Sequence, residues 1–178
     1  MTITTLSWLI SICLIILGIS FIRCKEKRNT NCLLFLRNNT LGLSLFAIAS
    51  FWFLSKIANL GEADFGAYKH WLLLLFISIF IGCGFYWKDF LVIRAIAMLT
   101  LMLCHLGLQV GYMSSALVRP FVSFFLYTLI VLALFFGTYP FKARDILPLL
   151  FGKKNRCLKW LGTISVFYGL LLLILSIQ

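Results

Sequence analysis

Six apolar runs, each close to the length of a membrane-spanning helix, dominate this sequence. A helix needs about 20 apolar residues to cross a hydrocarbon core of about 30 Å. Strands of an outer-membrane barrel instead alternate apolar and polar residues over about ten positions. The six runs are apolar on every face, which predicts an all-α protein, a polytopic transmembrane bundle of about six helices in one domain over residues 1–178. The predicted helices cover 5–22, 41–57, 71–87, 90–113, 120–139 and 160–177.

The composition excludes an ordinary soluble domain. The chain is 62% hydrophobic and 12% charged, with a mean hydropathy of +1.04, whereas about a quarter of the residues in a soluble domain are charged. The net charge of +11 is not arranged as a nucleic-acid-binding stripe, because the basic residues fall between the apolar runs. We therefore expect no nucleic-acid partner, and anionic lipids at the cytoplasmic face.

The basic residues also predict how the chain threads the membrane. Thirteen of the 16 Lys and Arg residues flank the first, third and fifth connections between the predicted helices. Cytoplasmic loops are enriched in Lys and Arg, so we expect both termini outside, in a multi-pass protein of a bacterial inner membrane. The basic stretch RCKEKR follows the first apolar run instead of preceding it. That order predicts a retained anchor helix and not a cleaved signal peptide.

The segment 141–159 mixes apolar and basic residues around Pro148. We expect a cytoplasmic amphipathic loop that lies on the inner surface as a broken stretch, with its cations near acidic headgroups. A basic loop that only sets the orientation of the helices explains the same pattern.

Cysteine and histidine do not form a recognisable metal or redox motif. The six cysteines include no C-x-x-C pair and no paired zinc-binding spacing. The two histidines, His70 and His105, are predicted at different depths in the membrane, which disfavours a haem held between them. We expect no metal, no cofactor and no catalytic residue. The protein is more readily interpreted as a non-enzyme, although the sequence leaves the enzyme question open.

The predicted helix 90–113 carries polar side chains within an apolar run. At 100° per residue, Arg94, His105, Gln109 and Tyr112 share one face. Arg94 is close enough to the inner end to reach the headgroups, but His105 lies only about 5 Å from the middle of the run. A buried imidazole needs a hydrogen-bond partner. Three interpretations are open: a bond to another helix, a water-lined path or proton relay, and ligation of a cofactor.

Gly107 and Gly111 form a G-x-x-x-G pair on roughly the opposite side of the same predicted helix. Small residues at this spacing let a neighbouring helix approach closely. We therefore expect one polar side and one packing side on this helix.

Three segments of the second half, FLVIRAIAML, YPFKARDILPLL and NRCLKWLGTISVFYGLLLLIL, are similar to those of a loosely defined group of uncharacterised small bacterial membrane proteins with several helices. The resemblance implies a multi-helix membrane fold, and it implies no activity.

Three classes of function are compatible with these features. The first is a non-enzymatic accessory or structural subunit of a membrane assembly, with a membrane-protein partner or a second copy; it is favoured because intramembrane polar groups are few. The second is a small-solute or proton-linked transporter or channel that uses the polar face of the fourth helix. The third is a membrane enzyme acting on lipids, with basic residues holding a headgroup.

Overall fold

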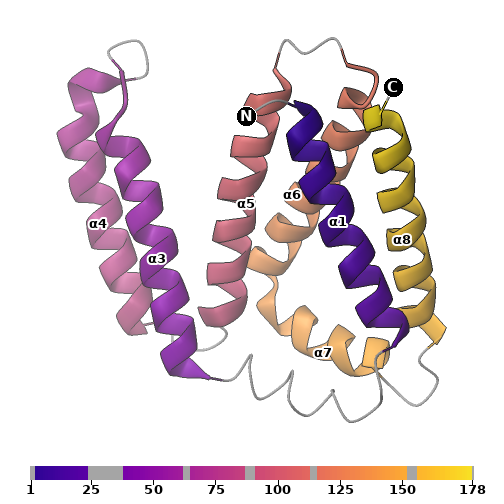
Figure 1. The fold of residues 1–178 in the computed structure, drawn as a ribbon. Coiled ribbons are helices and arrows are strands. Elements are labelled where there is room, and N and C mark those ends of the chain that lie inside the picture. The colour runs from indigo at the N-terminus through magenta and orange to yellow at the C-terminus, as the bar shows by residue number, and fades with distance from the viewer. Residues whose placement is uncertain are drawn as a thin grey trace.

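The computed structural model is all-helical over the residues that it describes, which are 3–23, 38–61, 65–86, 91–112, 116–151 and 156–177, with no side-chain description at 144, 147–151, 156, 157 and 177. Within these residues, six helices are long and apolar enough to cross a membrane, and α1 begins at the same end of the bundle at which α8 ends (Figure 1). The predicted transmembrane helical bundle is confirmed. The helices are α1 Ile3–Ile22, α3 Asn39–Ala58, α4 Lys69–Tyr86, α5 Leu91–Gly111, α6 Arg119–Thr138, α7 Pro140–Phe151 and α8 Arg156–Ile177.

The predicted and observed helix ends agree within about two residues for the first five spans. The last span differs, because α8 begins at Arg156 and the prediction began at residue 160. The segment 141–159 also differs from the expected broken loop. Most of it forms the continuous helix α7, which includes Pro148, and its last four residues belong to α8. The helix α7 lies across one end of the bundle (Figure 1).

The helices α1 and α8 form the closest pair in the bundle. Glycine makes this approach possible, since a methyl group at Gly18 would lie 2.5 Å from Val166 Cγ2 and 2.7 Å from the Gly162 carbonyl oxygen. Ser165 Oγ donates a 3.0 Å hydrogen bond to the carbonyl oxygen of Leu14 across the same contact. In lipid, such small-residue packing and interhelical hydrogen bonds hold helices together, because burial of apolar surface gives no advantage over lipid contact.

The main apolar core lies where α1 and α8 meet α5 and α6. Buried side chains from all four helices contribute to it, including Leu14, Cys104, Leu126 and Leu172. Tyr168 ties α8 to α6, because its hydroxyl donates a 2.8 Å hydrogen bond to the Phe121 carbonyl oxygen. The α5 helix contributes Cys104 to this core, so one side of α5 faces the core that it shares with α1, α6 and α8.

The α3–α4 hairpin packs on the other side of α5. Phenylalanine rings join the two helices of the hairpin, with Phe53 edge-on to both Phe76 and Phe80 at centroid distances of 5.0 and 5.8 Å. The α4 helix has no buried residue. It is held through α3, and α3 in turn contacts α5 (Figure 1).

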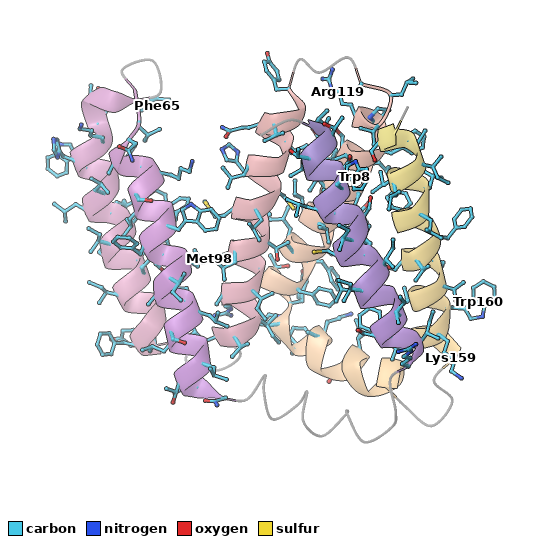
Figure 2. All side chains as sticks on the ribbon, in the orientation of Figure 1. Trp8, Phe65, Met98, Arg119, Lys159 and Trp160 are labelled. Carbon is cyan, nitrogen blue, oxygen red and sulfur yellow. The ribbon has the colours of Figure 1, made fainter. Side chains whose placement is uncertain are left out.

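The two ends of the bundle differ in the residues that they hold. The basic end holds Arg23, Lys142 and Lys159, and the terminal end is the one where α1 begins, α8 ends and Arg119 lies (Figure 2).

Candidate functional site

The helix α5 is continuous from Leu91 to Gly111, so the geometry expected for its polar residues applies. Helical periodicity places Arg94, His105 and Gln109 on one side. Tyr112 follows in the turn just after the helix, where its backbone N–H donates to the Gln109 carbonyl oxygen at 3.2 Å. The four residues therefore follow one another along one side of α5, from the basic end to the terminal end.

This side of α5 is the one that packs on α3. Leu91 and Ala95 form a small core with Phe46 of α3, and Met98 packs against it. Because Leu91, Met98 and His105 are seven residues apart, they lie within about 40° of one another around the helix. His105 thus continues the stripe of α5 that contacts α3 nearer the basic end.

Burial decreases steadily along this stripe towards the terminal end. Leu91 and Ala95 are 2% and 0% exposed, Met98 is half-buried, and His105 and Gln109 are exposed. In Figure 1 the α3–α4 hairpin leans away from α5 towards the terminal end. The helices therefore touch at the basic end and separate before they reach His105, which leaves the imidazole uncovered within the chain.

His105 is the deepest of the exposed polar side chains on this stripe. It lies about 6 Å along the axis from the middle of α5, whereas Gln109 lies about 12 Å from it. Within the described ranges, no hydrogen bond of the His105 side chain is present. The expected intrachain hydrogen bond to another helix is therefore not among the contacts of the described residues.

Arg94 occupies a different environment from the other three. It is half-buried, and its Nη1 atom is enclosed by protein. The guanidinium thus points at least partly into the protein near the basic end, where the sequence suggested a side chain extended to the headgroups. Asp89, the acidic residue five positions before Arg94 in the sequence, lies outside the described residues.

The side of α3 that faces α5 contributes one charged residue that the sequence did not single out. Gly42 faces α5, because a methyl group there would lie 3.1 Å from the Val92 backbone nitrogen and 3.3 Å from Leu91 Cβ. Lys56 lies 14 residues after Gly42 in α3, and His105 lies 14 residues after Leu91 in α5. Each is therefore about 21 Å along its helix axis from the contact between Gly42 and Leu91, and rotated about 40° around its helix from the contacting residue.

Lys56 and His105 therefore lie at the same level on helices that have separated, and both are exposed. Sequence reasoning missed Lys56 because a lysine near a helix end is ordinary. Its relation to His105 depends on the parallel pairing of α3 with α5, which no sequence pattern indicates.

The two glycines of α5 lie on its packing side. Gly107 is buried, and a methyl group there would lie 2.9 Å from Leu126 Cδ1 of α6. Gly111 is also buried, and a methyl group there would lie 3.6 Å from Ile3 Cδ1 of α1. Gly107 thus permits close approach of α6, while Gly111 has room for a small side chain.

The described part of the chain contains no group of three or more His, Cys, Asp and Glu residues that could hold a metal ion. The stripe offers one imidazole, one amide and one phenol as hydrogen-bonding groups, with the Lys56 ammonium on the helix opposite. These groups can bind polar side chains or anionic groups at membrane depth. No family model matches this chain, and neither a curated protein nor a solved structure shows detectable similarity to it.

Proposed function

We propose that this protein is a non-enzymatic subunit of a membrane assembly, and that it contacts another membrane protein through the stripe of α5 that carries His105 and Gln109. The observation that supports the proposal is the exposure of His105 within an apolar span. An imidazole that faces lipid lacks hydrogen-bond partners, which costs about 1–3 kcal/mol by the values measured in proteins. Polar residues inside membranes therefore face protein or a water-filled cavity in most cases.

The chemistry of the stripe restricts the partner. A neutral imidazole has one donor and one acceptor, and the Gln109 amide has both kinds of group. A helix with a polar side chain at matching depth would satisfy them, at about 0.6–1.7 kcal/mol for each interhelical hydrogen bond. A second copy of this chain could supply such groups, but not a carboxylate, because none of its five acidic residues lies in the six spans.

The cellular location belongs to the same proposal. The bias of Lys and Arg towards the odd-numbered connections supports a cell membrane with the basic end in the cytoplasm. The resemblance of the second half to small bacterial membrane proteins supports a bacterial inner membrane.

A transporter remains the second candidate, because Lys56 and His105 occupy one level on two separated helices. In that case the two side chains would line a water-filled path and not a protein contact. Water access at position 105 distinguishes the two functions.

The subunit proposal is tested by photocrosslinking in native membranes. A diazirine amino acid replaces Met102, which lies one turn from His105 and leaves the polar groups intact. The matched control replaces Leu103, an exposed residue about 160° from His105 around the same helix. We expect a discrete protein adduct from position 102 and lipid adducts from position 103. Lipid adducts from both positions would contradict the proposal.

A further inference from the structure

We propose that the basic end of the α1–α8 pair, carrying Arg23 and Lys159, binds the phosphate headgroup of an anionic phospholipid. This site lies at the basic end of α1 and α8, whereas His105 and Gln109 lie in the half of α5 nearer the terminal end, so it is independent of the proposed partner contact.

The close packing of α1 on α8 brings the two cations to one place. A methyl group at Gly162 would lie 2.9 Å from Ile22 Cγ1 and 3.2 Å from Phe21 Cβ. Arg23 directly follows Ile22, and Lys159 precedes Gly162 by three residues, about 4.5 Å along the helix axis. Arg23 and Lys159 are both exposed, so their charged groups are available at this end.

In the sequence around Arg23 and Lys159, cations greatly outnumber acids. Within six residues of Arg23 or Lys159, the sequence adds Lys25, Lys27, Arg28, Lys153, Lys154 and Arg156. The same stretches contain one acid, Glu26. Arg23 and Lys159 lie at the ends of two touching helices and repel each other, and a bound anion lowers that repulsion. An anionic ligand is therefore favoured at this end, and the lipid headgroups of a membrane surface supply anionic phosphate.

The surroundings of the charges favour a lipid over a free phosphate. Trp160 is 71% exposed and projects away from the pair beside Lys159 (Figure 2). Ile22 and Leu161 are also exposed apolar residues at this end. Tryptophan favours the boundary between headgroups and hydrocarbon. A ligand at this place meets cations on one side and apolar surface on the other, which matches a phospholipid with its acyl chains along the helices.

The opposite end lacks this concentration of charge. Its cations, Lys56, Lys69 and Arg119, lie on three different helices, α3, α4 and α6. Arg119 and Lys159 lie at opposite ends of the bundle (Figure 2). Lys69 and Arg119 therefore provide a matched control with the same change of net charge.

Native mass spectrometry of the full-length protein tests the proposal. The protein is released from detergent micelles that contain equimolar phosphatidylglycerol and phosphatidylcholine, and retained lipid is counted. We expect the wild type to retain phosphatidylglycerol preferentially, and R23Q/K159Q to lose about tenfold or more of that preference, since each cation near an anionic lipid contributes about fivefold. K69Q/R119Q should keep the preference, and unchanged thermal unfolding should show that both variants fold.

Three results would overturn the proposal. Equal retention of the two lipids by the wild type would exclude headgroup recognition. An equal loss of the preference for phosphatidylglycerol in the two double variants would show that this preference depends on net charge alone. Displacement of phosphatidylglycerol by millimolar glycerol phosphate or inorganic phosphate would assign the site to free phosphate, since a lipid held by its headgroup and chains resists displacement by the headgroup alone.

Discussion

Gly18 and Gly162 face each other across the α1–α8 contact at a distance that excludes any side chain, because a Cβ atom at Gly18 would lie 2.7 Å from the Gly162 carbonyl oxygen. The two helices are far apart in the sequence, yet they form the tightest contact in the bundle. Their contact forms one side of the core around α5 and brings Arg23 and Lys159 to the same end of the bundle.

Gly18→Ala should lower the free energy of unfolding by about 1–3 kcal/mol, because the added methyl group overpacks against backbone that cannot rotate away. Gly82→Ala is the matched control, since no atom lies within 4 Å of a methyl group there. Alanine has the higher helix propensity, by about 1 kcal/mol, so the control should be unchanged or more stable. Thermal or SDS-induced unfolding in mixed micelles measures both. Equal stability of the two variants would argue against the close α1–α8 contact.

Tyr168→Phe should lower the free energy of unfolding by about 0.6–1.7 kcal/mol, the range measured for hydrogen bonds between membrane helices. The substitution removes the bond from the Tyr168 hydroxyl to the Phe121 carbonyl oxygen and keeps the ring. Tyr127→Phe serves as the control, because Tyr127 is exposed and its hydroxyl has no hydrogen bond to the described residues. The same unfolding assay applies. A loss of equal size in both variants would assign the effect to removal of a hydroxyl group in general and not to the bond with Phe121.

Phe80→Ala should loosen α4 from α3. Phe80 packs edge-on against Phe46 and Phe53 at centroid distances of 5.8 Å. We expect a loss of about 1–2 kcal/mol, below the 3–5 kcal/mol of a water-soluble core, because lipid fills part of the space. Phe85→Ala, at a 73% exposed position of the same helix, should change stability by less than about 0.5 kcal/mol. Proteolysis of the membrane-embedded protein provides the second readout, with faster cleavage of the hairpin in Phe80→Ala alone.

The sequence predicted the spans well because each is set by a local property, the length of an apolar run. Pairing of the spans could not be predicted. Helical periodicity predicts the stripe of α5 that carries His105. The exposure of this stripe depends on the separation of α3 from α5, and the position of Lys56 opposite it depends on the parallel pairing of these two helices. The segment 141–159 was expected to be a broken amphipathic stretch, whereas its residues 141–151 belong to a helix that is continuous through Pro148. The preference of proline against helix interiors is therefore overridden in α7. The helix α7 contacts α5, α6 and α8.

His105→Leu should leave the unfolding of the purified monomer unchanged within about 0.5 kcal/mol, as expected for an exposed position. Replacement of the imidazole should instead weaken the proposed assembly by about 0.6–1.7 kcal/mol for each hydrogen bond lost, or about 3–20-fold in its dissociation constant. Size analysis of the complex after mild solubilisation measures that change. A large loss of monomer stability would place the imidazole in a contact within the chain.

The accessibility of a spin label beside His105 tests the partner contact most directly. The label is attached to Met102→Cys, one turn from His105, so that the imidazole is kept, in a background without the six native cysteines. Its collisions with oxygen and with a water-soluble nickel complex are measured in native membranes and in the purified monomer. A protein partner on α5 predicts low accessibility to both reagents in native membranes and high oxygen accessibility in the monomer. High oxygen accessibility in native membranes would contradict a partner and leave the imidazole facing lipid, and high nickel accessibility would contradict it in favour of a water-filled path.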